Sequence, residues 1–335
     1  MRRLIGIAST LILAAVILVT LTPSGGPVRA QQATAHPLVT PAEYLRWQTE
    51  LSNWGRWGKD DELGTLNLIT PAKRKQALAL AREGFPVSLA RDGNAVKGVD
   101  NPCPMEWALT TDAPETVTDR IAYPCIHGPG TTHLDSFAHM FFDGKMWNGY
   151  SRNLVTKEGG AAKVSILTMK NGILTRGVLY DIPKLKGVPY LEPGTRIFPE
   201  DLEAWEKMSG VKAGPGDALV FRWGKWARRA QVGPQPGDEA AGLDNSVIPW
   251  LKKRDIGLLV WETAGYNPQP PGDLARNALH NFVLEILGVH ILDRADLEAV
   301  SQAAAARKRW EFMLTVAPLP IPNGTGSPVN PLAIF

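Results

Sequence analysis

Three of the chain's six histidines lie between His127 and His139, in the string HGPGTTHLDSFAH. An imidazole is costly to bury unless both ring nitrogens have partners, so histidines this close to an acid usually act together. If residues 131–136 are extended, His133 and Asp135 point to the same face, because side chains in a strand alternate with a period of two. The string therefore predicts a metal site.

The other members of the string can reach the same point. A helical turn after Asp135 would place His139 one turn further along, on the same side. His127 precedes Gly128-Pro129-Gly130, a sequence that reverses chain direction easily. Nitrogen and carboxylate ligands suit Zn²⁺ first, and Mn²⁺ if more oxygen joins the shell. The alternative is a set of separate structural histidines, because single histidines are more often hydrogen-bonded residues than ligands.

Several segments resemble one family. The stretch THLDSFAH, followed by FFDGKMWNGY, resembles the signature of the cyclase family of metal-dependent hydrolases, which includes bacterial kynurenine formamidases and isatin hydrolases. The segment WGRWGKDDELGT, the surroundings of His280 and the tail GSPVNP also resemble family segments. The resemblance covers residues 45–335 and implies a swivelling β/β/α fold, a mixed α/β single domain with a central mixed sheet or barrel.

The chain departs from the family pattern at two positions. Short members carry their first ligand histidine four residues before the second, where this chain has Pro129, so His127 must substitute for it. A family glutamate late in the chain corresponds to Asp293, whose side chain is one methylene shorter. The resemblance thus implies the metal ligands His127, His133, Asp135 and Asp293, and leaves open whether they hold one ion or two.

The resemblance also implies a mechanism. A divalent ion lowers the pKa of a bound water toward neutrality and so supplies a nucleophile for the carbonyl carbon of a small cyclic amide, formamide or lactone. We expect His139 to move protons, and His280 or the metal to stabilise the oxyanion. Without the resemblance, His280 would be interpreted as a core histidine, because Leu279, Phe282 and Leu284 surround it.

Aromatic residues are candidates for substrate binding, since the chain has eleven tryptophans. Trp54 and Trp57 lie in a segment that family members use near the pocket, and Phe141 and Trp147 follow His139. We expect these four side chains to contact a flat ligand, although tryptophans also anchor cores.

Two other function classes use the same residues. A secreted ligand-binding protein could stack sugars on tryptophan, but it would not need His139 beyond the ligands. A metal-dependent lyase or isomerase is also consistent, because a metal that polarises a carbonyl acidifies the adjacent proton. Arg222 can bind a substrate carboxylate or form a structural ion pair.

The N-terminus has the pattern of an export signal. Arg2 and Arg3 precede an apolar run to Leu21, and a segment of small residues then ends at Ala30. This pattern predicts a signal peptide over residues 1–30 and a periplasmic or secreted mature protein without stable membrane association. An uncleaved membrane anchor is the alternative, since the apolar run approaches the roughly 18 residues that span a bilayer.

Charge limits the classes of binding partner, and the two cysteines allow one disulfide. Removing residues 1–30 leaves 33 Lys and Arg against 33 Asp and Glu, which gives no sign of the clustered basic residues that nucleic acid requires. We therefore expect a small-molecule substrate and, from the family, a homo-oligomer. Cys103 and Cys125 either form a disulfide before the histidine cluster or stay free thiols.

Hydrophobic patterning predicts a polar, poorly ordered lead-in over residues 31–44 and one domain over 45–335. His290 is expected at the surface, where a strand begins. The patterning predicts helices over 71–83, 199–208, 246–254, 276–287 and 294–306, and strands over 86–89, 163–167, 177–181, 218–222, 256–262 and 311–316.

Overall fold

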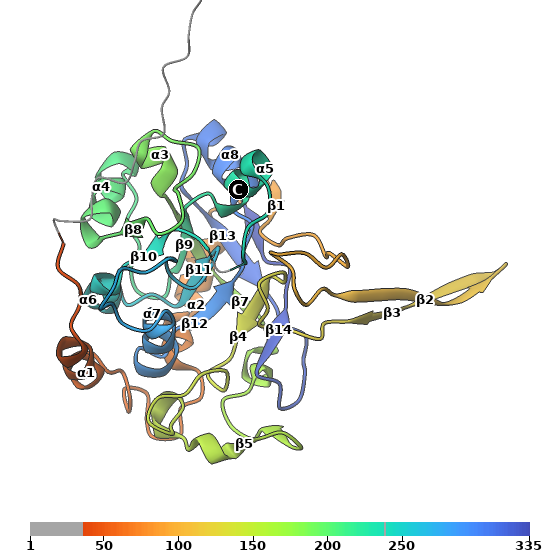
Figure 1. Cartoon of the computed structure of the whole chain (residues 1–335), viewed down its shortest axis with the longest axis horizontal. Coiled ribbons are helices and arrows are strands. Elements are labelled where there is room, and N and C mark those ends of the chain that lie inside the picture. The colour runs from red at the N-terminus through yellow and green to blue at the C-terminus, as the bar shows by residue number, and fades with distance from the viewer. Residues whose placement is uncertain (1–35, 238) are drawn as a thin grey trace, which may run out of the picture. The chain divides into compact units, whose positions relative to one another are not determined.

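A nine-stranded mixed sheet runs through the chain (Figure 1). The computed structural model describes residues 36–237 and 239–335, so the predicted signal peptide lies outside the described residues. In spatial order the strands are β1 (Pro86–Ser88), β15 (Leu332–Ile334), β13 (Glu311–Val316), β7 (Ile173–Asp181), β9 (Ala218–Arg222), β11 (Leu258–Trp261), β12 (His290–Asp293), β4 (His133–Asp135) and β14 (Gly326–Pro328).

The middle of this sheet is parallel and its outer parts are antiparallel. Strands β7, β9, β11 and β12 run parallel to one another, and every pair outside them is antiparallel. All residues of β9 and β11 are buried, as expected for parallel strands covered on both faces. The expected mixed α/β fold with a central mixed sheet is confirmed.

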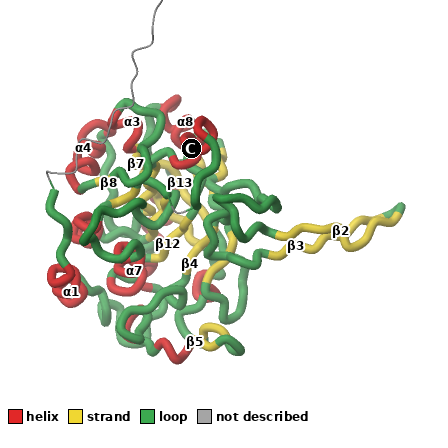
Figure 2. Tube along the Cα trace, in the orientation of Figure 1, coloured by secondary structure: helices red, strands yellow, loops and turns green. Residues whose placement is uncertain are grey.

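Helices and loops surround the sheet (Figure 2). The helices are α1 (Pro41–Glu50), α2 (Pro71–Leu78), α3 (Ile182–Lys186), α4 (Pro199–Ser209), α5 (Lys225–Val232), α6 (Ile248–Arg254), α7 (Ala278–Asn281) and α8 (Glu298–Arg307). Two short strand pairs lie apart from the main sheet: β5 (Val155–Thr156) with β6 (Gly160–Ala161), and β8 (Arg196–Ile197) with β10 (Gly242–Leu243). None of the helices in the described chain has the length and hydropathy to cross a membrane.

Local sequence explains where some helices begin and end. Helix α4 starts with Pro199 at its first position and ends at Gly210, whose φ of 72° favours glycine. Helix α1 begins with a capping box between Thr40 and Glu43. The prediction of a poorly ordered lead-in as far as residue 44 is therefore wrong at its end.

The predicted elements differ from the observed ones at several places, and the helix expected over 71–83 ends at Leu78. Residues 163–167 were expected to form a strand, but Val164 has a φ of 49°, which no strand accommodates, and its N–H donates to Glu62. The long helix expected over 276–287 is the short α7 followed by a π-helical turn, Phe282–Ile286. The helix expected from residue 294 begins only at Glu298.

A two-stranded ribbon, which we call the arm, projects from the rest of the fold (Figure 1). It consists of β2 (Glu106–Ala113) and β3 (Thr116–Ala122), and sequence patterning did not predict it. A disulfide between Cys103 and Cys125 joins the two ends of the arm where it leaves the fold. This pairing settles the alternative that the sequence left open for the two cysteines.

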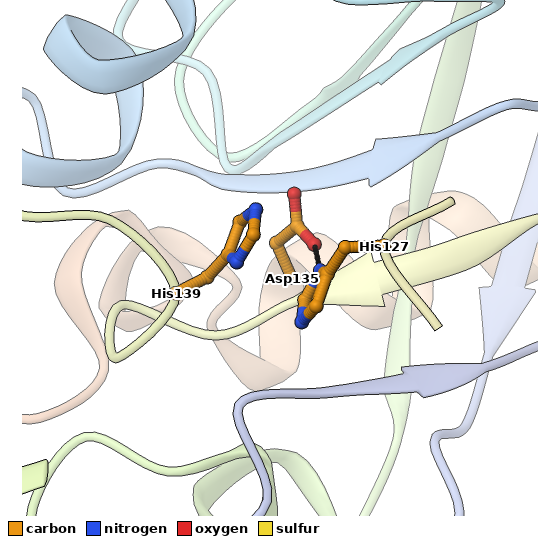
Figure 3. Close-up of side chains that lie close together, drawn as sticks. All are labelled: His127, Asp135 and His139. Atoms are coloured by element: carbon orange, nitrogen blue, oxygen red, sulfur yellow. Dashed lines mark hydrogen bonds and ion pairs between the residues drawn. The ribbon is translucent and has the colours of Figure 1, made fainter. Parts of the chain in front are cut away.

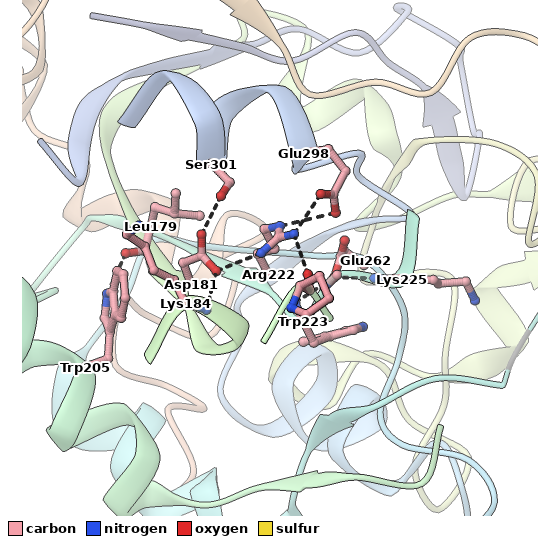
Figure 4. A network of polar contacts seen from close by, with 12 residues as sticks. Leu179, Asp181, Lys184, Trp205, Arg222, Trp223, Lys225, Glu262, Glu298 and Ser301 are labelled. Atoms are coloured by element: carbon pink, nitrogen blue, oxygen red, sulfur yellow. Dashed lines mark hydrogen bonds and ion pairs between the residues drawn. The ribbon is translucent and has the colours of Figure 1, made fainter. Parts of the chain in front are cut away.

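Charged side chains meet at the carboxyl ends of the parallel strands (Figure 4). Arg222, the last residue of β9, donates to Asp181 at the end of β7 and to Glu298 in α8. Ser301 donates a further hydrogen bond to Asp181. Of the two interpretations of Arg222, the structural ion pair is the one observed.

Glu285 in the π-helical turn is a fully buried acid. Neither of its carboxyl oxygens has a hydrogen bond of normal geometry among the described residues. Burial raises the pKa of Glu285 well above its ordinary value, and the nearby backbone of Trp147 opposes this only in part. The folded chain therefore favours the neutral, protonated form of Glu285 over the ionised form.

We predict that the free energy of unfolding of Glu285→Gln rises relative to that of the wild type as pH rises. The unfolded chain releases the proton of Glu285 above about pH 4.3, whereas the folded chain keeps it to higher pH, so this group lowers the stability of the wild type as pH rises, by at most about 1.4 kcal/mol per pH unit. Glutamine has no proton to release. Urea unfolding of both proteins from pH 5 to 8 measures the difference, with the exposed Glu203→Gln as control; a constant difference would contradict the prediction.

Candidate metal centre

The carboxylate of Asp135 lies at the centre of a group of imidazole rings. Its Oδ1 lies 2.8 Å from Nδ1 of His127, the contact drawn in Figure 3, and 3.4 Å from Nε2 of His133. Its Oδ2 lies 3.1 Å from Nε2 of His280. Asp135 itself has no exposed surface. Histidines from the middle and the late part of the chain thus converge on one buried acid.

The rings also decide the charge of Asp135. Burial alone would raise the pKa of this carboxyl, because it removes the ionised form from water. The neighbouring His133 and His139 and the hydrogen bonds from His127 and His280 outweigh burial, and hold the pKa of Asp135 well below its usual range. The site is therefore built around a carboxylate anion.

Strand β4 provides the rigid part of this site. It lies between β12 and β14, with Asp293 opposite His133 and Gly326 opposite Asp135. His133 and Asp135 share a face of the strand, as the sequence predicted. The chain then turns at Ser136, whose carbonyl accepts a hydrogen bond from the N–H of His139. This is a tight turn, not the helical turn expected, but it returns His139 to the same side.

The orientation of the His133 ring suits a cation beside Asp135. Its Nδ1 lies 2.7 Å from the carbonyl oxygen of Thr131, which can only accept, so Nδ1 carries the proton. Burial lowers the pKa of His133, so the ring is neutral and Nε2 has a lone pair. That lone pair faces the Asp135 carboxylate at 3.4 Å. Two acceptors in this position fit a cation between them, and a backbone-oriented imidazole is the usual state of a metal ligand.

His127 and His139 are stacked. Their ring centroids are 3.6 Å apart and the planes differ by 5°. One nitrogen of each ring and an oxygen of Asp135 lie within 4.8 Å of one another, close enough to share an ion (Figure 3). Burial lowers the pKa of His139 to about 3, although the Asp135 carboxylate opposes that shift, so the ring is neutral. His139 is therefore placed for either ligation or proton transfer.

His280 in α7 and Asp293 at the end of β12 lie near the same group. His280 is buried, its Nδ1 has no hydrogen-bond partner among the described residues, and its ring lies 5.8 Å from that of His139. Asp293 is buried opposite His133, and its Oδ1 accepts from the N–H of Arg294. The structure thus places His280 against Asp135 and Asp293 opposite His133, while the group with ligand atoms close enough to share an ion is His127, Asp135 and His139.

His290 is not at the surface, contrary to expectation. It is fully buried at the start of β12, its Nδ1 donates to the backbone carbonyl of Asp135, and its ring stacks on Phe137 at 3.8 Å. Burial lowers its pKa to about 4. The expectation failed because β12 is flanked on both sides by strands, which the apolar run after His290 did not reveal.

The aromatic residues expected to bind substrate have mixed surroundings. Trp147 has no exposed surface, packs on Phe137 and donates its N–H to Asp61. Trp57 lies 6.3 Å from the Trp147 ring, and Trp54 donates to the carbonyl of Glu285. Phe141 is partly buried. In this structure Trp147 supports the loop after His139 from inside the core.

Sequence reasoning missed Thr325, which contacts the site from just before β14. Its hydroxyl lies 3.1 Å from Nε2 of His127. A single threonine so far from the histidines along the chain gives no motif or periodicity. The resemblance of the tail from Gly326 onward was the only signal near it.

The chain also matches known proteins. A family model described as "Putative cyclase" matches residues 91–268, more than half of the chain. The chain belongs to the Cyclase family. The matched range contains the histidine string from His127 to His139, whereas His280 and Asp293 lie beyond it. Curated proteins gave no significant match.

Solved structures share the Cyclase family fold. A crystal structure of a "novel cyclase" is 29% identical, covers 86% of this chain and 99% of its own, and has a TM-score of 0.74. Isatin hydrolase A from Ralstonia solanacearum is 18% identical, with 77% and 95% covered and a TM-score of 0.51. An isatin hydrolase bound to the product analogue thioisatinate is 16% identical, with 79% and 99% covered and a TM-score of 0.52.

We predict that His133→Ala weakens metal binding at least 10-fold, because it removes the nitrogen lone pair that faces Asp135. Competition between the purified protein and a chromophoric chelator measures the affinity for Zn²⁺. His36→Ala, a histidine outside the site, is the control and should bind as the wild type does. Equal affinities for the two variants would exclude His133 as a ligand.

Proposed function

We propose that this chain is an exported metal-dependent hydrolase, in which activated water attacks the carbonyl carbon of a small cyclic amide, formamide or lactone. The observation that carries the proposal is the lone pair of His133 facing the buried Asp135 carboxylate, which calls for a cation. Membership of the Cyclase family and the fold shared with isatin hydrolases support it.

The donors of the site fit a divalent ion. His127, His133 and Asp135 would hold it, and Asp293 would complete or orient the shell. Two imidazoles and a carboxylate suit Zn²⁺ first and Mn²⁺ second. When bound, the ion supplies Lewis acidity, which lowers the pKa of water toward neutrality and polarises a carbonyl. Elemental analysis of the purified protein tests the identity and the number of ions.

Two histidines are left for the chemistry. His139 accepts a proton from the attacking water at a ring nitrogen and then donates it to the leaving nitrogen or oxygen. His280 lies on the other oxygen of Asp135 and, with an N–H turned toward the substrate, would stabilise the oxyanion. Trp54, Trp57 and Phe141 are the proposed contacts to the flat part of the substrate, and Trp147 supports them.

A hydrolysis screen tests the reaction. Aryl formamides, isatin-like lactams and lactones are incubated with the enzyme, with and without chelator, and products are identified by mass spectrometry. Chelator-sensitive addition of water to one class supports the proposal. A product of unchanged mass identifies an isomerase, and one formed by elimination identifies a lyase. Ligand binding without any product identifies a binding protein.

We predict that His139→Ala keeps its metal and loses roughly 100-fold or more in turnover, in the range for removing a general acid/base. Turnover of the best substrate from the screen and metal content are measured together. Loss of the metal in this variant would instead identify His139 as a ligand, which its distance from Asp135 and His127 permits. Full turnover would remove His139 from the mechanism.

Export remains part of the proposal. The pattern of residues 1–30 supports it, and so does the Cys103–Cys125 disulfide, since disulfides persist mainly in oxidising compartments. Cell fractionation with N-terminal sequencing of the mature protein tests it. Recovery of an uncleaved chain in the membrane fraction would favour the anchor.

The arm supports the proposed homo-oligomer. Trp107, Leu109, Val117 and Ile121 share one face of it, because Trp107 pairs with Ile121 and the others alternate along the strands. These side chains are 47% to 59% exposed. A two-stranded ribbon is marginally stable alone in water, so a second copy covering this face would stabilise it.

We predict that Trp107→Ser with Ile121→Ser lowers the molecular mass of the assembly in light scattering. The pair Ala108→Ser with Arg120→Ser alters the opposite face of the arm at the neighbouring positions and should leave the mass unchanged. A monomeric wild type, or an unchanged mass in the first variant, would show that the arm has another role.

A further inference from the structure

His127 is held differently from the other residues at the site. His133 and Asp135 lie on a strand, whereas His127 lies in a turn that follows the disulfide at Cys125. Its side chain is 24% exposed, against 2% for His133 and none for Asp135. Within the part of the chain that the structure describes, one backbone hydrogen bond closes this turn, from the Gly128 N–H to the Cys125 carbonyl. The orientation of the ring must therefore come from contacts outside its own segment.

Those contacts come from the segment that leads into β14. The hydroxyl of Thr325 lies 3.1 Å from Nε2 of His127. A Cβ on the next residue, Gly326, would lie 2.6 Å from Cε1 of the same ring, so glycine is needed where the backbone passes the imidazole. The opposite nitrogen, Nδ1, faces Asp135. Thr325 and Gly326 thus fix the side of the ring that points away from the carboxylate.

A hydroxyl suits this position because it can both donate and accept. A neutral imidazole has one N–H and one lone pair. Without an ion, the N–H at Nδ1 donates to the Asp135 carboxylate, and Nε2 accepts from the hydroxyl of Thr325. An ion held beside Asp135 would need the lone pair of Nδ1; the ring proton would then be on Nε2 and would donate to the same hydroxyl. The threonine satisfies Nε2 in either state.

We propose that Thr325 is a positioning residue that lets His127 change tautomer when the cation binds. Because Thr325 contacts Nε2, the nitrogen that ligates the cation is Nδ1. This inference rests on the proposed metal site. It explains how this chain supplies a ligand six residues before His133, although Pro129 occupies the position four residues before it. A ligating histidine in a turn needs a hydrogen-bond partner from another segment to orient its ring. A ligating histidine in a strand can be oriented by its own segment.

The backbone of Thr325 is held independently of its hydroxyl. Its carbonyl accepts from both the N–H and the hydroxyl of Ser136, at 3.0 and 2.8 Å. Gly326 then pairs with Asp135 across β14 and β4. Replacing the threonine with valine therefore removes the hydroxyl and keeps the shape and the backbone contacts, so the variant should fold.

The test compares Thr325→Val, Thr325→Ser and His127→Ala in the full mature chain. Zn²⁺ affinity is measured by competition with a chromophoric chelator. We expect roughly 10-fold or greater weakening in Thr325→Val, in the range for removing an outer partner of a ligating histidine, and near wild-type affinity in Thr325→Ser. Thr175→Val is the control. It removes a different buried hydroxyl, that of Thr175 in β7, which donates to the carbonyl of Gly216.

A second readout follows the tautomer. In zinc-loaded wild type labelled with ¹⁵N-histidine, the proton of His127 should be on Nε2, and it should return to Nδ1 when zinc is removed. A proton on Nδ1 in the zinc form would overturn the inference, as would equal zinc affinities for Thr325→Val and the wild type. If the wild type binds neither zinc nor manganese, that result would contradict both the proposed function and this inference. If His127→Ala alone binds normally, the inference fails while the proposed function stands.

Discussion

A carboxylate cannot be taken out of water without compensation, and the site depends on how Asp135 is compensated. Removing an ionised carboxylate from solvent costs far more than a single hydrogen bond returns. In this chain the hydrogen bonds to the carboxylate come from side chains widely separated in sequence: His127, a few residues before the acid, and His280, late in the chain. The anion therefore links distant parts of the chain, because none of the rings alone would keep it charged.

This requirement also gives the sheet its functional role. Strand β4 is three residues long and would not be stable by itself, yet it lies between β12 and β14 and is fixed from both sides. Strand β12 places Asp293 opposite His133, and β14 brings Thr325 and Gly326 to the edge of the His127 ring. The edge of the sheet that ends in β4 and β14 thus determines where the ligands lie.

Much of the site could be predicted from sequence because its chemistry is local. The spacing of His133 and Asp135 follows from the period of a strand, and the family resemblance added His280 and Asp293, which no local pattern reveals. The burial of His290 could not be predicted, since it depends on which strands flank β12. Thr325 was missed for the same reason. A contact between two loops leaves no period in the sequence.

The fold was predicted unevenly. Strands β9 and β13 coincide with their apolar runs, because continuous burial selects such residues. The arm was missed since its strands are exposed on both faces, so no buried face imposes an apolar alternation on the sequence. The strand expected near Val164 failed on a single backbone angle, which the β-branched composition of that segment conceals.

The disulfide has a consequence for how this protein can diverge. Cys103 and Cys125 close the arm into a covalent ring that meets the fold at one point. Insertions, deletions or a peptide-bond break within that ring leave the place where the chain re-enters the catalytic region unchanged. Natural variation can therefore reshape the projecting ribbon, and any assembly it forms, without moving the first histidine of the cluster.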